Sequence, residues 1–488
     1  MSARLSTLAE RLPGAVLHGP DVTVGDATHD SRDVRPGALF CAVRGATHDG
    51  HDHVAEAVAA GAAALLVERP VPGGTPQLVV PSVRAALGPA AAAVHADPAT
   101  ELRMLGVTGT NGKTTVTFLL EAAMAAAGWG SGRIGTLGAR LHGRPEPGVR
   151  TTPEATDLQR LLRSLRTRGA DGVAMEVSSH GLDLQRVDGT VFDVAAFTNL
   201  TRDHLDWHGT MDAYLAAKAR LFTPALARHA VVHVDAPGAD ALLARVEVPV
   251  TTIGTGPGVD VAVARRTSGP DGSTAVVSLD GSELEVGTVM RGAHNLDNVL
   301  VALVTAVRAG IAPSVVRDAL ATVPAPPGRL EPFGGGGDPL VLVDYAHTPD
   351  AVARIVGLGR TLVGAGAALH VVLGAGGDRD RDKRGPMGRA AGDADRVLVT
   401  DDNPRGEDPA AIRAAVAAGA REGSASVEDV AGRADAIERA VLAAGPGDVV
   451  LVLGRGHEAE QEVAGRRSPL DDRDLVRAAL ARRTGAVA

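Results

Sequence analysis

The sequence predicts an α/β protein of three domains, and three observations support this prediction. The chain has 488 residues, which at about 150 residues per domain corresponds to roughly three domains. Apolar segments of strand length alternate with helical segments, a pattern typical of parallel sheets covered by helices on both faces. The composition turns abruptly to Pro and Gly over Val323–Pro339, which indicates a linker or a strand-edge loop. We therefore expect domains at residues 1–98, 99–327 and 328–488.

The composition argues against several classes of protein. Hydrophobic residues make up 45% of the chain and charged residues 22%, as in globular proteins. A formal net charge of −9 argues against nucleic-acid binding, because no basic excess is present to neutralise phosphates. The N-terminus lacks the apolar core of a signal peptide, and the long apolar stretches are interrupted by charges, so no membrane span is expected.

Cysteine usage bears on the compartment. Cys41 is the single cysteine of the sequence, so an intramolecular disulfide is excluded. This fits a reducing cytosol, and we expect a cytoplasmic protein. The oligomeric state is left open, with a monomer favoured.

The strands of each block indicate where a ligand would bind. In the first block, the short strands "AALLVE" and "QLVV" accompany an Ala-rich helix. The second block begins with a strand at Leu102–Val107, continues with three further apolar strands and closes with the helix "NLDNVLVALVTAVRAG". Ligands of open α/β sheets bind beyond the carboxyl ends of the strands. The third block therefore predicts a site, since its four strands end in polar residues: "LVLVDYAHTPD", "LHVVLGAGGDRD", "RVLVTDDNPR" and "DVVLVLGRGHE".

A phosphate-binding loop is predicted at "GVTGTNGKTT" (Gly106–Thr115), between a strand and an apolar helical segment. Glycines allow backbone N–H groups to approach phosphates, and the start of the helix adds partial positive charge. Lys113 would pair with the β and γ phosphates, and Thr114 would offer its hydroxyl to Mg²⁺. The spacing departs by one from the strict pattern, which requires Gly where this chain has Val107. A glycine-rich turn without a ligand is the alternative, but strand, loop and helix together favour ATP binding.

This loop resembles that of the Mur ligases, the ATP-dependent amino-acid ligases of peptidoglycan assembly, and the three-block plan is similar to theirs. The resemblance implies an N-terminal UDP-binding α/β domain, a central P-loop-type parallel-sheet ATPase domain and a C-terminal Rossmann-like α/β domain. It also implies that a carboxylate is activated as an acyl phosphate and that an amine then displaces the phosphate. The loop residues assigned to ATP are Gly109, Thr110, Asn111, Gly112, Lys113, Thr114 and Thr115.

Three side chains are candidates for metal binding besides Thr114. Glu176 ends an apolar strand and offers the hard oxygen ligand that Mg²⁺ prefers. His204, in "NLTRDHLDWHG", is by itself typical of a hydrogen-bonded loop residue, but the resemblance implies a second Mg²⁺ ligand. Lys218 is by itself typical of a solvated helix; in Mur ligases the lysine at this place carries a CO₂-derived carbamate that binds metal. Burial near cations would lower its pKa and favour that reaction. With Lys113, these three form the predicted catalytic set.

The resemblance implies three further contacts to ATP. Asn298, in "GAHNLDNVLVAL", would contact adenine; otherwise it is a polar residue near a helix start. Asp344, in "DYAHTPD", would bind the ribose from the third block, so that domain closure assembles the site. Arg329, in "GRLE", would reach the phosphates, or is a solvated linker arginine.

The sugar-nucleotide substrate implied is UDP-N-acetylmuramoyl-L-alanyl-D-glutamate. Around "THDSRDVRPGALFCAVRG", the resemblance implies contacts to the uridine diphosphate, although a turn that caps a helix is the alternative. In "SSHGLDLQRVDG" the family often has Gln where this chain has Leu184, so a contact from Gln185 is in doubt. The predicted substrate contacts are Ser31, Gly45, Ala46, Thr47, Thr151, Thr152, Ser178 and Arg186.

The "DNPR" stretch predicts which amine is added. Meso-diaminopimelate differs from L-lysine by one carboxylate, which a guanidinium can bind with two parallel hydrogen bonds. The sequence Asp402, Asn403, Pro404, Arg405 is the form that this motif takes in diaminopimelate-adding Mur ligases. Arg384 matches a second cationic contact, or is solvated in a charged run. Gly454 and Glu458, in "GRGHE", match the positions that receive the amino group.

Two other functions remain as alternatives. Within the enzyme class, the chain could add lysine or another diamino acid, or act as a folylpolyglutamate-type ligase; the UDP features and "DNPR" argue against both. From a different class, it could be an ATP-binding regulatory relative without turnover. The presence of Glu176, His204 and Lys218 together argues against that alternative.

Overall fold

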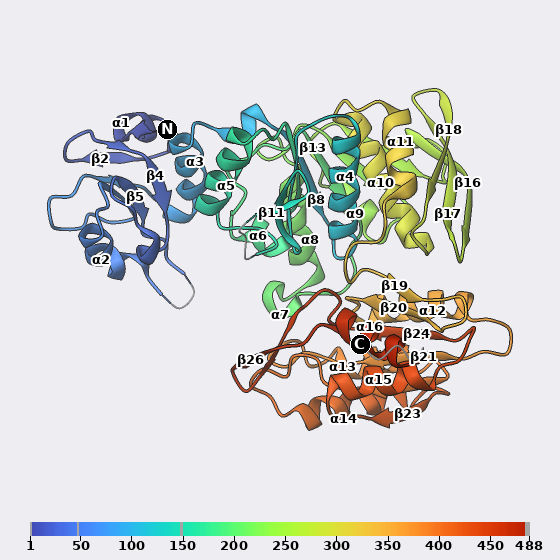
Figure 1. Cartoon of the computed structure of the whole chain (residues 1–488). Coiled ribbons are helices and arrows are strands. Elements are labelled where there is room, and N and C mark those ends of the chain that lie inside the picture. The colour runs from blue at the N-terminus through green and yellow to red at the C-terminus, as the bar shows by residue number, and fades with distance from the viewer. Residues whose placement is uncertain (1, 46–47, 147–149, 484–488) are drawn as a thin grey trace.

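The computed structural model describes residues 2–45, 48–146 and 150–483. It contains three α/β domains, each with its own sheet, as the sequence predicts. Figure 1 shows the first domain at the left of the central domain, and the C-terminal domain below the central one. Among these residues, no helix has the length and apolar character needed to cross a lipid bilayer.

The first domain contains a five-stranded sheet of order β2-β7-β6-β5-β4. Strands β4 to β7 are parallel to one another, and β2 joins the edge antiparallel to β7. A separate antiparallel pair links β1 to β3. The elements are β1 Ala3–Arg4, α1 Leu5–Arg11, β2 Val16–His18, β3 Thr23–Val24, β4 Asp26–Thr28, β5 Ala38–Cys41, α2 Val54–Ala59, β6 Ala64–Val67, β7 Gln77–Val79 and α3 Val83–Val94.

The central domain contains an eleven-stranded sheet of order β11-β10-β9-β12-β8-β13-β14-β15-β16-β17-β18. Its seven strands from β9 through β16 in this order pair in parallel, but both ends continue as antiparallel strands. The strands are β8 Arg103–Thr108, β9 Ser131–Gly135, β10 Gly138–Leu141, β11 Arg144–Glu146, β12 Gly172–Glu176, β13 Val194–Phe197, β14 Ala230–His233, β15 Val250–Gly254, β16 Val261–Gly269, β17 Gly272–Leu279 and β18 Ser282–Thr288.

The predicted parallel central sheet is confirmed, and antiparallel strands that the sequence analysis did not predict extend it at both edges. The turn between β17 and β18 contains Asp280 and Gly281, both with positive φ (50° and 78°). Asp-Gly between two strands is a strong hairpin signal, because such two-residue turns match the twist of antiparallel strands. The Asp-Gly signal is present in the sequence, but the alternation of strands and helices elsewhere led us to expect a parallel sheet.

Helices cover the central sheet, and most connect its parallel strands. The predicted closing helix corresponds to α10, but α11 follows it before the C-terminal domain. The helices are α4 Lys113–Ala126, α5 Ala155–Thr167, α6 Ser179–Asp183, α7 Leu205–His208, α8 Met211–Ala219, α9 Ala239–Leu243, α10 Ala293–Arg308 and α11 Pro313–Thr322.

The C-terminal domain contains a six-stranded sheet of order β19-β20-β24-β21-β22-β23. Its edge strand β19 is antiparallel to β20 and lies within the Pro- and Gly-rich stretch, while the other five strands are parallel. The elements are β19 Glu331–Gly334, β20 Leu340–Asp344, α12 Pro349–Leu362, β21 Leu369–Leu373, α13 Arg384–Ala391, β22 Arg396–Val399, α14 Pro409–Ala420, β23 Ser426–Asp429, α15 Arg433–Ala443, β24 Val449–Leu453, β25 Glu460–Val463, β26 Arg466–Pro469 and α16 Asp472–Arg483.

The strand ends position the site. The loop after β8 and the carboxyl ends of β12 and β13 lie at one edge of the central sheet, since parallel strands end on the same side. The carboxyl ends of β20, β21, β22 and β24 lie together in the same way in the C-terminal sheet. Residues from both edges line shared cavities between the two domains.

Candidate functional site

The phosphate loop requires glycine at two positions. Gly109 has φ of 149° and Gly112 has φ of 89°. A Cβ at Gly109 would lie 1.9 Å from Thr198 Oγ1, and one at Gly112 would lie 2.3 Å from Asn298 Oδ1. The loop therefore folds tightly against β13 and α10, and the backbone at the start of α4 is left open to an anion.

Two lysines converge on the backbone of this loop. Lys113 Nζ donates hydrogen bonds to Gly109 O at 2.8 Å and Thr110 O at 2.9 Å. Lys218 Nζ, from α8, donates to the same Gly109 O at 2.8 Å, with its side chain 0% exposed. The alternative of a solvated helix lysine is therefore wrong for Lys218. Burial and the nearby Lys113 cation hold the pKa of Lys218 well below its usual range, which favours a neutral amine.

Glu176 is fully buried at the end of β12. Its Oε1 accepts a hydrogen bond from Thr136 N at 2.9 Å and its Oε2 accepts one from Thr136 Oγ1 at 3.0 Å. Thr114, Glu176 and His204 line one cavity of about 920 Å³ that also contains the phosphate loop. These carboxylate, hydroxyl and imidazole donors are chemically suited to Mg²⁺.

His204 stands at the start of α7 with φ of 53°, a conformation that few non-glycine residues adopt. Burial lowers the pKa of His204 to about 4, although neighbouring Asp203 opposes the shift. The imidazole is therefore neutral at neutral pH, as a metal ligand must be. Within the described ranges, no group of three or more His, Cys, Asp and Glu side chains is arranged to hold a metal.

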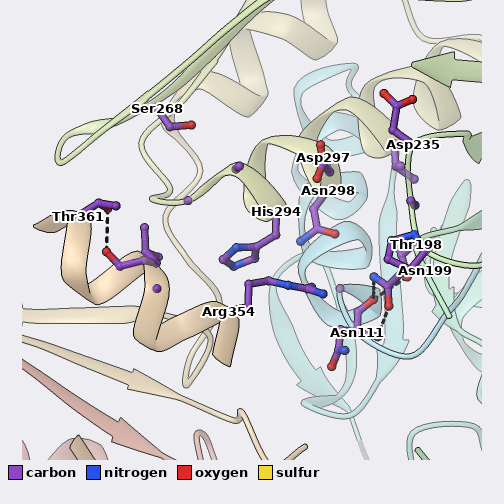
Figure 2. A pocket seen from close by; sticks show the side chains of 18 residues that line it. Asn111, Thr198, Asn199, Asp235, Ser268, His294, Asp297, Asn298, Arg354 and Thr361 are labelled. Carbon is purple, nitrogen blue, oxygen red and sulfur yellow. Dashed lines mark hydrogen bonds between the residues drawn. The ribbon is translucent and has the colours of Figure 1, made fainter. Parts of the chain in front are cut away.

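A second cavity, of about 600 Å³, opens on the other side of the phosphate loop. Figure 2 shows Asn298 and His294 projecting from α10 toward Arg354, which comes from α12 of the C-terminal domain, with Asn111 of the loop below them. Asn298 Nδ2 donates to Asn295 Oδ1 at 3.3 Å. Burial lowers the pKa of His294 to about 4. Asn298 was predicted from the sequence, whereas His294 and Arg354 were not.

Arg329 and Asp344 join the phosphate loop to the C-terminal domain. Arg329 Nη2 donates to Thr114 Oγ1 at 3.4 Å, and its guanidinium lies 4.5 Å from the centre of the Tyr345 ring. It is therefore no solvated linker residue. Both oxygens of Asp344 accept backbone N–H groups at 2.8 Å, from Leu330 and Ala346, while burial raises the pKa of Asp344. In this structure Asp344 holds the turn that carries Arg329.

Four predicted substrate contacts line the cavity that holds the phosphate loop: Thr151, Thr152, Ser178 and Arg186. Thr152 Oγ1 donates to Glu176 O at 2.9 Å, so this stretch is tied to the end of β12. Arg186 Nε lies 2.8 Å from Glu154 Oε1. Gln185 has φ of 54° and is not among the described residues lining this cavity.

The first-domain predictions lie elsewhere. Ser31 Oγ donates to Glu56 Oε2 at 3.2 Å, and Gly45 N donates to His48 O at 2.8 Å. Neither is among the described residues lining the cavity with the phosphate loop. Ala46 and Thr47 lie outside the described residues. The proposed uridine contacts therefore stay predictions.

The "DNPR" turn lines a third cavity, of about 240 Å³. Arg405 has φ of 53°, and its backbone pairs with β25: its N–H donates to Glu462 O at 3.0 Å and its carbonyl accepts from Ala464 N at 2.6 Å. Its Nη1 donates to Gly377 O at 2.7 Å. The lining combines the cations Arg379, Lys383 and Arg405 with the acids Asp203, Asp206, Asp380, Asp402 and Glu458, together with Asn403 and Gly454.

Arg384 is placed differently from its neighbours in the charged run. It is buried, and its Nη2 and Nη1 donate to Glu407 Oε1 and Oε2 at 2.9 and 3.2 Å. The alternative of a solvated residue is therefore wrong, yet Arg384 is not among the described residues that line the 240 Å³ cavity. Lys383, which the sequence analysis did not assign, lines it instead. A direct contact between Arg384 and a substrate stays a prediction.

The cavity of the phosphate loop and the cavity of "DNPR" adjoin each other. Both are lined by His204, Tyr345 and Glu458, among other residues. Asp203 also lines both, with Oδ2 3.8 Å from His347 Nε2 across the two domains. Sequence reasoning missed Asp203 and His347, although each lies next to a strand end that had already been singled out. An amine held at "DNPR" can thus reach a group held at the phosphate loop.

Comparisons with known proteins agree with this geometry. Three family models match the chain: "Mur ligase family, catalytic domain" at residues 26–100, "Mur ligase middle domain" at 107–306 and "Mur ligase, glutamate ligase domain" at 328–456. UDP-N-acetylmuramoyl-L-alanyl-D-glutamate--2,6-diaminopimelate ligase of Streptomyces coelicolor is 43% identical, over 99% of this chain and 97% of its own length. The enzyme of the same name from Corynebacterium efficiens is 43% identical, over 98% and 95%.

Solved structures show the same arrangement. A structure of UDP-N-acetylmuramoyl-L-alanyl-D-glutamate--2,6-diaminopimelate ligase matches with a TM-score of 0.71 and 31% identity, over 99% of this chain and all of the other. Folylpolyglutamate synthase of Mycobacterium tuberculosis matches with a TM-score of 0.62 at 22% identity, over 76% of this chain. The second match concerns the fold alone.

Proposed function

The chain belongs to the Mur ligase family, and we propose that it adds meso-2,6-diaminopimelate to UDP-N-acetylmuramoyl-L-alanyl-D-glutamate with ATP as the energy source. The observation that carries the proposal is that two adjoining cavities share part of their lining. One holds the phosphate loop, and the other joins Arg405 to the acids Asp402 and Glu458. A molecule with an ammonium and a carboxylate at one end matches the second cavity, and its far amine can extend into the first.

The chain's own residues support an acyl-phosphate route. Lys113 and the N–H groups at the start of α4 would hold the β and γ phosphates, and Arg329 beside Thr114 would add a second cation. The γ-phosphoryl bond to ADP breaks as a new P–O bond forms to the substrate carboxylate. The acceptor amine then attacks the carbonyl carbon, the C–O bond to phosphate breaks, and the amine loses a proton.

Mg²⁺ would supply charge neutralisation between the phosphates, held by Thr114, Glu176 and His204. Lys218 would join these ligands only after reaction with CO₂, because as an amine it donates to Gly109 O rather than offering an oxygen. Its burial and lowered pKa supply the neutral amine that the reaction needs. Carbamylation turns this nitrogen into a carbamate and releases one proton.

The residues that line the cavities suggest where ATP and the sugar nucleotide would bind. Asn298, with His294 and Arg354, would surround the base of ATP in the 600 Å³ cavity. Thr151, Thr152, Ser178 and Arg186 would hold the peptide part of the sugar nucleotide, with Ser31 and Gly45 nearer its uridine. We further propose domain boundaries after residues 98 and 327, and a cytoplasmic monomer, in keeping with the single buried cysteine.

A phosphate-release assay with UDP-N-acetylmuramoyl-L-alanyl-D-glutamate and ATP tests the proposal. The proposal expects turnover with meso-diaminopimelate and little with L-lysine, because lysine would leave Arg405 without a carboxylate. Preference for lysine would point to the lysine-adding alternative. Turnover with folate and glutamate instead would point to the folylpolyglutamate-type alternative, and ATP binding without ADP formation with any amine would point to a regulatory relative.

A further inference from the structure

A group of buried charges lies directly behind the 240 Å³ cavity of "DNPR", which we call the acceptor cavity. It consists of two guanidiniums, Arg433 and Arg455, and three carboxylates, Asp402, Glu458 and Asp472. We call these five residues the charge cluster. Both arginines and Asp472 have side chains that are 0% exposed, whereas Asp402 and Glu458 also line the cavity. Neither the arginines nor Asp472 was assigned any role from the sequence.

Arg455 lies at the centre of the charge cluster. Its Nη1 lies 3.9 Å from Asp402 Oδ1 and 3.8 Å from Glu458 Oε2, and its Nε lies 3.9 Å from Asp472 Oδ1. Its Nη2 donates to Glu460 O at 2.7 Å and to Leu470 O at 3.1 Å. One guanidinium thus spans the ends of β22 and β24, the start of β25 and the segment that leads to α16. Arg433 and Asp472 form a bidentate pair beside it, at 2.6 and 2.7 Å.

Within the charge cluster, three carboxylates face two guanidiniums, and on the cavity side Arg405 and Lys383 add positive charge near Glu458 and Asp402. Burial and the neighbouring Asp402 raise the pKa of Glu458, whereas Arg455, Asn403 and Arg405 oppose this shift. Two carboxylates at a mostly buried site are costly unless cations or hydrogen-bond donors face them. The open side of the cluster is the acceptor cavity, where an ammonium group could approach both carboxylates.

We propose that Arg455 is a positioning residue for the acceptor: from behind the cavity it holds Asp402 and Glu458 in place, as a pair that receives one ammonium group. The inference rests on the proposed function, since the ammonium is that of the diamino acid. Arg455 touches no substrate in this account. It acts through Asp402 and Glu458, and through the hairpin β25–β26 that it ties to the "DNPR" turn.

Contacts between the hairpin and the turn extend this argument. Gln461 Nε2 donates to Asp402 O at 2.6 Å, and Glu462 N donates to Asn403 Oδ1 at 2.8 Å. Asn403 Nδ2 in turn donates to Glu458 Oε2 at 2.6 Å. Because Arg455 binds the start of the same hairpin, loss of its guanidinium would loosen Glu458 and the turn together. Loss of this guanidinium should therefore weaken binding of the acceptor and leave binding of ATP unchanged.

The test compares R455M and R455K with wild type, using ATP, UDP-N-acetylmuramoyl-L-alanyl-D-glutamate and meso-diaminopimelate. We expect R455M to raise the KM for diaminopimelate about 10-fold or more, with the KM for ATP unchanged. R455K keeps the charge but lacks the planar fork, so it should restore part of the loss. The control is R396M, which removes an ion pair with Glu428 near the amino end of β22, away from the cavity. This control should leave both KM values unchanged.

The outcomes separate the two claims. If wild type adds no diaminopimelate, the proposed function fails first. If wild type is active and R455M keeps a wild-type KM for diaminopimelate, or raises both KM values equally, the role of Arg455 is overturned. Should R455M fail to fold, as judged by its melting temperature, R455K decides. A KM for diaminopimelate raised about 3-fold or more at constant ATP KM supports the inference, and an unchanged one overturns it.

Discussion

The phosphate loop and the acceptor cavity hold charge in opposite ways. At the loop, Lys113 and Lys218 meet backbone carbonyls, and neither forms an ion pair in the described part of the chain. At the acceptor cavity, Arg455 and Arg433 lie among three carboxylates that they nearly neutralise. The loop thus leaves Lys113 without an ion pair and free to face an anionic ligand, while the acceptor cavity is built around internal ion pairs. The first arrangement favours binding of phosphates at the expense of stability, and the second holds a precise shape.

Replacing Lys113 tests the loop most severely. K113M removes a cation that would face the transferring phosphoryl group, and we expect kcat to fall about 10³-fold or more. The free energy of unfolding should stay the same or rise, because the variant removes a partly buried cation that forms no ion pair in the described part of the chain. Steady-state kinetics and urea unfolding measure the two effects. A variant that keeps wild-type kcat would remove Lys113 from the reaction.

Replacing Lys218 tests whether the loop also needs an anion. K218A removes the proposed carbamate, and we expect kcat to fall by about 10²- to 10³-fold. Added acetate should restore part of the activity, because its carboxylate can take the place of the carbamate. In wild type, ¹³C NMR with labelled bicarbonate should give a carbamate signal that K218A lacks. Wild-type activity in K218A would contradict the metal-ligand role.

Breaking the Arg433–Asp472 ion pair of the charge cluster should lower the free energy of unfolding, in contrast to K113M. D472N leaves Arg433 buried without a charged partner, and we expect a loss of about 3–5 kcal/mol in the free energy of unfolding. The control is D280N, which breaks the exposed pair with Arg308 and should cost less than about 1 kcal/mol. Urea unfolding of both variants at pH 7 makes the comparison. Equal losses of unfolding free energy in D472N and D280N would mean that burial does not increase the contribution of the Arg433–Asp472 pair to stability.

The smallest expected effect concerns Glu407, which holds Arg384. Arg384 and the Asp378 N–H lower the pKa of Glu407 to about 2. A carboxylate with a depressed folded-state pKa adds stability above its unfolded pKa of about 4.5, and this stability is lost as the pH falls toward 2. E407Q should therefore flatten the dependence of melting temperature on pH between 5 and 3. An unchanged slope would show that the Glu407–Arg384 pair adds no stability.

The two regions also differ in how far the sequence predicts them. The phosphate loop is local: a strand, two obligatory glycines and a helix start follow one another, so Lys113 and Thr114 could be assigned from the pattern. Residues at strand ends, such as Glu176 and Arg405, could be singled out because parallel strands end together. The central antiparallel edges were missed although Asp280-Gly281 signalled a hairpin.

Contacts between distant segments could not be predicted. Arg455 lies among carboxylates from three separate stretches, and no pattern in "GRGHE" says that its side chain points inward. The pairing of Arg384 with Glu407 depends on how α13 packs against the turn after β22. His294 and Arg354 meet across two domains, as Figure 2 shows, so neither segment alone indicates a shared cavity.

The most direct test of the central claim is the ratio of kcat/KM for meso-diaminopimelate to that for L-lysine, measured in wild type and in R405A. The account predicts a ratio of about 10⁴ in wild type, because lysine leaves a guanidinium unpaired. In R405A the ratio should fall toward 1, with the KM for ATP unchanged. A wild-type ratio near or below 1, or a high ratio that survives in R405A, would contradict the assignment of Arg405 as the residue that selects the acceptor.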